Sequence, residues 1–430
     1  MISRLTFTTS TFAVLALTAG AAFADTNQAH LKQTQTGTGA GTNSALVVQS
    51  GSDNEAGSAT QNMKQTASSN SNNDLNILQS GNNNDIGLNG FSQLSQYASS
   101  PNGNTADIEQ QSNDNVVGKV EQKNRFGGAV GATGNALTIL QTGGDDNVIT
   151  SVSQDKHKGG GGNTADITMT GASNTISSVV QAVTGGVQGN NMTVTISGGD
   201  NGRGTLSGFA ALSGAETSTL KQGFKDVNNG NAAKGNNSLT LDISGGSNQF
   251  GVTQQGVNNT VGTLSITGDS NQLGIYQDGD ANSVDLAVLG GAFNNVGVTQ
   301  GGTNYSDISI VGNSNQASIT QSGLNGDGTD GFGVELSING DFNGTGTFSG
   351  YAAGSLLVNG TIDQSGNNNL FTASITDDGN MFAGLQFGDD NTANITVAGN
   401  TNQFAVSQVG NTNVANLAQT GNNNNAFINQ

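Results

Sequence analysis

Hydrophobic and polar positions alternate along short segments of this chain, and the same arrangement returns along its length. The segment Asn-Val-Ala-Asn-Leu-Ala-Gln (residues 413–419) has Ala and Leu on one face and an amide at each end of that face, because side chains alternate across a strand. Residues 402–408 and 424–430 repeat this arrangement. The alternation predicts one β-strand per segment, and the abundance of Gly, Asn, Thr and Ser disfavours a helix.

A tight turn of the form Gly-x-x-Asn separates these segments. Its glycines recur with a step of 11 residues at Gly388, Gly399, Gly410 and Gly421. Gly and Asn accept positive φ at little cost, so these positions are the predicted turns. One strand and one turn make an 11-residue unit, and two units make a strand-turn-strand rung of about 22 residues. Rungs stacked about 4.8 Å apart give an all-β fold, a β-solenoid of cross-β type that is competent to form amyloid.

Stacking places equivalent amide side chains above one another, where they hydrogen-bond along the axis. Such a ladder explains how a buried face can contain so many amides, because each polar group finds a partner in the next rung. The predicted ladder consists of Asn391, Asn402, Gln408, Asn413, Gln419, Asn424 and Gln430. We expect these residues to form a surface for self-assembly.

The regularity of the repeat divides the chain. It is regular over residues 236–430 and irregular, with insertions, over 49–235. Residues 25–48 have no clear phase and are predicted to be a flexible polar leader. Further loop insertions are expected at Asp155–Gly162, Gly202–Gly235 and Leu324–Gly333, which either protrude from the solenoid or separate blocks of rungs.

Composition argues against both an ordinary globular fold and disorder. Hydrophobic residues make up 33% of the chain, which is below the globular range, but charged residues are only 10% and there is a single Pro. The 12 Lys and Arg all lie at or before Lys234, whereas 15 acidic residues follow it. Residues 235–430 therefore offer no surface for phosphate groups, which excludes nucleic acid as a partner and disfavours an anionic membrane.

The first 24 residues are predicted to be a secretory signal peptide. Arg4 provides the positive start, Phe12–Leu17 the apolar core, and Ala22-Phe23-Ala24 the cleavage site before Asp25. No other segment has the length of apolar sequence that a membrane span needs. The chain has no Cys, so disulfides do not stabilise it outside the cell.

Residues that could support catalysis or metal binding are few. The two histidines, His30 and His157, are far apart in sequence and have no accompanying metal-binding motif. Acidic pairs occur at Asp145-Asp146, Asp377-Asp378 and Asp389-Asp390. They could bind Ca²⁺ or act in acid–base chemistry, but Asp also favours turns and opposes premature stacking through its charge. We expect no enzyme activity, no metal and no cofactor.

The motif Q-x-G-x-x-N-x-A-x-x-x-Q is complete over residues 408–419 and again over 419–430, and partial copies begin at Gln49 and Gln386. In these residues the chain resembles the curlin-repeat family of Gram-negative bacteria. Asn402 and Asn413 stand where that family commonly has Ser, and this chain is long and interrupted, so the resemblance is to a divergent member.

The resemblance implies export through the periplasm and a dedicated outer-membrane secretion pore, with related curlin subunits as further partners. It also implies that copies of the chain polymerise at the cell surface into curli-like amyloid fibres, similar to pili or fimbriae, that mediate cell adhesion and form biofilm matrix.

Two other functions remain open from the sequence. One is a monomeric or capped β-solenoid surface adhesin that binds glycans or Ca²⁺; it needs capped ends, whereas the last repeat here runs to Gln430. The other is a secreted polysaccharide lyase or hydrolase. The absence of Trp and of any basic residue after Lys234 disfavours it.

Overall fold

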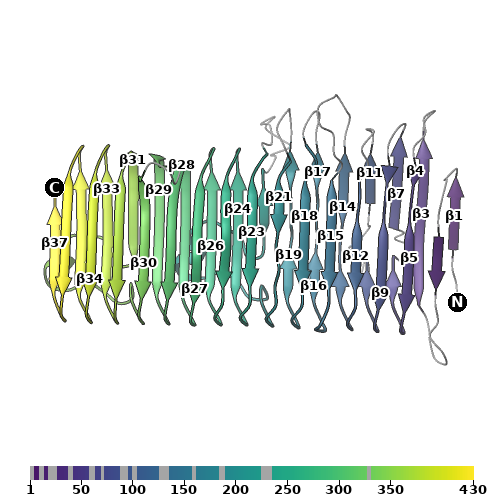
Figure 1. The fold of residues 1–430 in the computed structure, drawn as a ribbon, viewed down its shortest axis with the longest axis horizontal. Helices are drawn as coiled ribbons and strands as arrows, with labels where there is room; N and C mark the ends of the chain where they lie inside the picture. Colours follow the sequence, from purple (N-terminus) through teal and green to yellow (C-terminus); the bar gives the residue numbers. More distant parts are fainter. Residues whose placement is uncertain are drawn as a thin grey trace. The chain divides into compact units, whose positions relative to one another are not determined.

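The computed structural model describes residues 4–8, 14–17, 27–36, 42–57, 63–68, 72–87, 95–98, 104–124, 135–156, 161–183, 189–223, 235–326 and 331–430. The chain divides into two compact units. Unit 1 comprises residues 1–203 and 218–237, and unit 2 comprises residues 204–217 and 238–430. Strands β1–β22 belong to unit 1, and strands β23–β37 with both short helices belong to unit 2 (Figure 1).

Unit 2 is built from two parallel sheets that the chain visits in turn. Sheet I contains β23 (Ser238–Ile243), β25 (Thr260–Ile266), β27 (Ser283–Gly290), the end of β28 (Asn295–Val311), β30 (Gly333–Asn339), β32 (Leu370–Thr376), β34 (Thr392–Ala398) and β36 (Val414–Thr420). Sheet II contains β24 (Gln249–Gln255), β26 (Gln272–Asp278), the start of β28, β29 (Gln316–Asn325), β31 (Thr361–Asn367), β33 (Met381–Phe387), β35 (Gln403–Val409) and β37 (Asn425–Asn429).

The core of unit 2 lies between these sheets. Alternate residues of β32 are buried, as the period of a strand requires. Aromatic rings stack in the same way as the rungs: Phe382 and Phe404 are fully buried, with ring centroids 6.3 Å apart. Residues 22 positions apart occupy the same place in successive rungs, as in the pair Gln386 and Gln408. The predicted β-solenoid with a rung of about 22 residues is therefore confirmed for this unit.

Unit 1 is built from three parallel sheets. The first contains β1 (Arg4–Thr8), β3 (Gln28–Thr36), β7 (Met63–Ser68), β11 (Ser95–Ala98), β14 (Glu121–Asn124), β17 (Asp155–Lys156) and β20 (Ala182–Val183). The second contains β2 (Val14–Leu17), β5 (Leu46–Ser50), β9 (Asn76–Ser80), β12 (Asp107–Gln110), β15 (Ala136–Gln141), β18 (Thr164–Met169) and β21 (Asn191–Thr193).

The third sheet of unit 1 continues from β3 into β6 (Glu55–Ala56), β10 (Asp85–Ile86), β13 (Val116–Val117), β16 (Val148–Thr150) and β19 (Thr175–Ser177). Two short strands, β4 (Thr42–Asn43) and β8 (Asn72–Asn73), pair with each other, and β22 is Leu220–Gln222. Each rung here adds a third strand, so equivalent Asn residues are 27 to 32 positions apart. The predicted 22-residue rung does not extend to this unit.

Two predicted irregular segments contain regular structure. The expected leader, residues 25–48, includes β3, which pairs with β7. In this pairing the backbone of Lys32 is in register with Lys64, and that of Gln33 with Gln65. The expected loop Gly202–Gly235 contains β22 and a short helix, α1 (Gly208–Leu212). A second short helix, α2 (Gly350–Ala353), lies in a segment where no insertion was predicted. Ala24 and Asp25, the expected cleavage site, lie outside the described residues.

Candidate functional site

A continuous ladder of glutamine side chains runs through the interior of unit 2. Each Nε2 donates to the Oε1 of the equivalent glutamine in the next rung, over 2.7 to 3.1 Å. The members are Gln254, Gln277, Gln300, Gln321, Gln364, Gln386, Gln408 and Gln430. The same Nε2 also donates to a backbone carbonyl of the facing sheet, as Gln386 does to the Leu370 carbonyl at 2.8 Å. The ladder thus joins rungs to one another and the two sheets to each other.

Asparagine side chains form two more ladders, one at each turn between the sheets. In both, the Oδ1 of one asparagine accepts from the backbone N of the asparagine one rung later, and at most positions it also accepts from the Nδ2 of that asparagine. Asn391 accepts from Asn413 at 3.0 and 2.9 Å, and Asn402 accepts from Asn424 at 2.9 and 2.9 Å. Apart from Asn413 and Asn424 in the last rung, these ladder asparagines are buried. The repeat satisfies nearly all of their polar groups, which offsets the cost of burying amides. The exception in these two columns is the buried Nδ2 of Asn402, which has no hydrogen-bond partner among the described residues.

The structure brings together six of the seven predicted ladder residues, in three separate columns. Asn391 lies above Asn413, Asn402 above Asn424, and Gln408 above Gln430. Gln419 joins none of these columns, because strand register pairs it with Val397. Its Nε2 donates to the backbone carbonyl of Gln403 at 3.2 Å, and its buried Oε1 has no hydrogen-bond partner among the described residues. The prediction for Gln419 is wrong because residues 11 apart lie on opposite sheets, and residues stack only when they are one full rung apart, which is 22 positions in this part of the chain.

Two of the four predicted turn glycines, Gly388 and Gly399, occupy positions that exclude any side chain. Gly388 and Gly399 have φ of +118° and +115°, values that L-residues rarely adopt. A Cβ on Gly388 would lie 2.1 Å from the carbonyl oxygen of Gly410, and one on Gly399 would lie 2.2 Å from that of Gly421. Two rungs therefore approach each other at the turn as closely as backbone allows.

Gly410 and Gly421 belong to the last rung and have open space on the side where a further rung would stack. Their φ values, +112° and +92°, match those of the inner turns. A Cβ would meet nothing nearer than 3.7 Å at Gly410 and 4.0 Å at Gly421. Among the described residues, β36 pairs with β34 and β37 pairs with β35, and each has no second neighbour.

Unit 1 uses the same amide chemistry in its own columns. Gln49, Gln79, Gln110 and Gln141 form one glutamine ladder. Asn54, Asn84, Asn115, Asn147, Asn174 and Asn201 form an asparagine ladder. No ladder was predicted in this unit, because the predicted amide stacking depends on an 11-residue step that unit 1 does not have.

Acidic side chains also fall into columns, since every rung presents the same positions. Asp285, Asp307 and Glu335 are in register on adjacent strands of sheet I. Partial burial, together with the neighbouring carboxylates of Asp285 and Glu335, raises the pKa of Asp307. In unit 1, burial and the carboxylates of Glu55 and Asp114 raise the pKa of Asp85 to about 6.

Replacing Asp85 by Asn should stabilise the protein at pH 7 and have little effect near pH 4. The folded protein holds the Asp85 proton more tightly than the unfolded chain does, so wild-type stability rises as pH falls from about 7 through 6 and is fully gained below about 4. Asp85 is only partly buried, so we discount the shift for screening to about 1 kcal/mol, or roughly 2–4 °C in Tm. Calorimetry at both pH values tests this. An equal Tm difference at pH 4 and pH 7 would contradict it.

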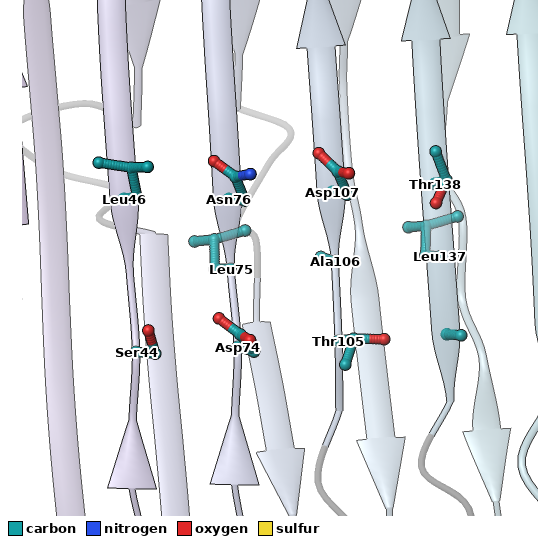
Figure 2. A pocket seen from close by; sticks show the side chains of 11 residues that line it. Ser44, Leu46, Asp74, Leu75, Asn76, Thr105, Ala106, Asp107, Leu137 and Thr138 are labelled. Atoms are coloured by element: carbon teal, nitrogen blue, oxygen red, sulfur yellow. The ribbon is translucent and has the colours of Figure 1, made fainter.

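A shallow pocket of about 410 Å³ crosses the outer face of unit 1 (Figure 2). Side chains from successive strands line it in rows: Leu46, Asn76, Asp107 and Thr138 in one, Leu75, Ala106 and Leu137 in the next, and Ser44, Asp74 and Thr105 in a third. Burial, then Glu109 and Asp74, raise the pKa of Asp107. No aromatic ring is among its lining residues, so it offers a glycan no ring face to stack on. It gives the adhesin alternative little support.

The described residues also bear on metal binding and on membrane insertion. Within the described ranges, no three His, Cys, Asp or Glu side chains are grouped so that they could hold a metal ion. Over the same residues, neither α1 nor α2 has the length or apolar character to cross a bilayer. No protein-family model matches the sequence, and no curated protein is significantly similar to it.

Proposed function

We propose that this chain is a secreted structural subunit whose copies add end to end, rung on rung, to build an extracellular curli-like amyloid fibre for cell adhesion and biofilm matrix. The proposal rests on one observation above all. Successive rungs of unit 2 are joined by recurring amide contacts, and the last rung carries the same groups with no following rung among the described residues.

The last rung has the chemistry of an inner rung without its neighbour. Asn413 and Asn424 each donate two hydrogen bonds to the rung before, and no described residue donates to their own Oδ1 atoms. The edges of β36 and β37 carry backbone groups that a further strand could pair with. A second copy that continues the register would satisfy all of these groups at once.

Export fits this proposal. Removal of residues 1–24 would take away β1 and β2, which pair with β3 and β5. The mature chain would then begin its first rung at β3 and β5 and expose their edges. Unit 2 has columns of carboxylates and no basic residues to neutralise them. Repulsion between these carboxylates opposes the association of copies at neutral pH and so limits premature assembly.

Replacing Gly421 by Ala separates folding from assembly. In the single chain the new Cβ has nothing within about 4 Å, so the cost is backbone strain alone. In a fibre the incoming rung would bring a carbonyl to the place that Gly421 itself occupies next to Gly399, about 2.2 Å from the Cβ. We expect elongation at this end to fall at least about tenfold, because such overpacking costs about 1–3 kcal/mol.

The matched control is Gly331→Ala, which also has positive φ, +77°, and open space around the added Cβ. Both variants should keep wild-type circular dichroism, and only Gly421→Ala should slow growth of wild-type seeds followed by thioflavin fluorescence and sedimentation. Equal growth of the two variants would contradict stacking at this rung. A wild-type mature chain that stays monomeric would contradict the fibre itself.

A further inference from the structure

Two segments of unit 2 repeat each other outside the strand pattern. Residues 204–211 read Gly-Thr-Leu-Ser-Gly-Phe-Ala-Ala, and residues 346–353 read Gly-Thr-Phe-Ser-Gly-Tyr-Ala-Ala. Each lies in a longer stretch that crosses the outer face of sheet II and contains a single short helix, α1 or α2. We call residues 204–217 the first strap and residues 345–360 the second strap.

Both straps are fastened to sheet II by the same pair of amides on neighbouring strands. In the first strap, Ser207 N donates to Gln272 Oε1 and Ala210 N donates to Asn295 Oδ1, both over 2.7 Å. Asn295 Nδ2 donates back to the Ser207 carbonyl at 2.9 Å.

In the second strap, Gln403 and Asn425 take these roles. Ser349 N donates to Gln403 Oε1 at 2.7 Å, and Ala352 N donates to Asn425 Oδ1 at 2.8 Å. Asn425 Nδ2 donates to the Ser349 carbonyl at 2.8 Å. Because Gln403 and Asn425 correspond to Gln272 and Asn295, the two straps occupy the same position relative to the strands beneath them.

The first strap reaches one strand further than the amides that fasten it. Asn295 lies on β28, and α1 also contacts the next strand of the sheet, β29. Beyond β29, the Phe209 ring lies against Gly360, the last residue of the second strap, whose carbonyl accepts from Ser318 N of β29; an added Cβ on Gly360 would be 2.9 Å from Phe209 Cε2. Phe209 is partly buried by this contact.

The second strap makes the same overhang, but no described strand lies beneath it. Asn425 lies on β37, which has no further strand beside it among the described residues. Tyr351 corresponds to Phe209 in the repeat and is 76% exposed. The strap is therefore positioned to cover one more rung than the described part of the chain provides.

We propose that the overhang of the second strap is a docking site for a rung of a second copy of this chain. The incoming strand pairs with β37 and passes beneath Tyr351, as β29 passes beneath α1. The first strap covers strands of this chain's own solenoid. A second copy supplies strands of the same kind, so it is the partner that fits beneath the second strap. The inference rests on the proposed function and adds that the strap, beyond the amide ladder, selects and holds the incoming copy.

The test uses single thiols, because the chain has no Cys. Mature chain with Tyr351→Cys is mixed into a large excess of wild type, assembled, and treated with a maleimide; Leu356→Cys, in the same strap and 91% exposed, is the control. We expect the thiol of Tyr351→Cys to react at least about tenfold more slowly in assemblies than in monomer. The thiol of Leu356→Cys should react equally in both. Tyr351→Ser should also slow seeded growth more than Leu356→Ser does.

The outcomes distinguish this inference from the proposed function. Fibres in which the Tyr351→Cys thiol reacts as in the monomer would overturn the docking site and leave the fibre standing. Protection in a dimer that does not grow further would support the docking site and contradict the fibre. A chain that never associates would overturn both.

Discussion

Replacing Gly388 by Ala should be among the most destabilising single changes in unit 2. The new Cβ would lie 2.1 Å from the Gly410 carbonyl oxygen, at a φ of +118° that Ala rarely adopts. Backbone strain and overpacking each cost about 1–3 kcal/mol, so we expect a loss of about 3–5 kcal/mol. Denaturant unfolding, followed at several wavelengths because the chain has two units, measures the loss.

Gly379→Ala is the matched control for this change. Gly379 also has positive φ, +68°, but an added Cβ would meet only Thr401 Cγ2 at 3.4 Å, an ordinary contact. Its cost should be the strain of the left-handed conformation alone, about 1–2 kcal/mol. Similar losses for the two variants would mean that close approach of the rungs does not explain the turn glycines.

Replacing Gln386 by Leu should be comparably severe, and replacing Gln419 by Leu should be nearly neutral. Gln386 is fully buried; it accepts from Gln364 at 2.7 Å and donates to Gln408 at 2.9 Å. Leucine would leave these neighbours and the Leu370 carbonyl without their partner, at about 1–3 kcal/mol for each group. We expect a total loss of about 3–6 kcal/mol.

Gln419 provides the contrast because it has the same side chain but stacks on no other amide. It is in register with Val397, and its Oε1 already lacks a partner among the described residues. Leucine there removes one hydrogen bond of 3.2 Å and an unsatisfied oxygen, so the change should stay within about 1 kcal/mol of wild type. The pair is compared by urea unfolding of the mature protein. A loss at Gln419 as large as that at Gln386 would mean that the ladder assignment is wrong.

The two units differ in how far the sequence predicts them. In unit 2 every rung has two strands of similar length, so the 11-residue step leads directly to the rung and to the columns of amides. The 11-residue step does not show which of the two opposite sheets a residue joins. For this reason Gln419, on sheet I, was predicted to share a ladder with Gln408, on sheet II. In unit 1 the third strand can be as short as β6, with two residues, which is too short to show alternation. The intervals of 30 between Gly51 and Gly81 and 27 between Gly144 and Gly171 were the available signal.

The straps show a second limit of sequence reasoning. Their backbone lies on the outer face of a sheet, held by Gln and Asn side chains that are indistinguishable in sequence from ladder amides. Gly274 and Gly297 permit the close approach, since an added Cβ would lie 2.1 Å from the Ala210 carbonyl oxygen and 2.0 Å from that of Phe209. Only the duplication of residues 204–211 at 346–353 could have identified them.

Stacking of subunits rung on rung is the central claim, and X-ray fibre diffraction of aligned assemblies of the mature chain tests it most directly. We expect a meridional reflection at about 4.8 Å from strands perpendicular to the fibre axis, with an equatorial spacing of about 10 Å between the sheets. Assemblies without the meridional reflection, or with strands parallel to the fibre axis, would contradict it.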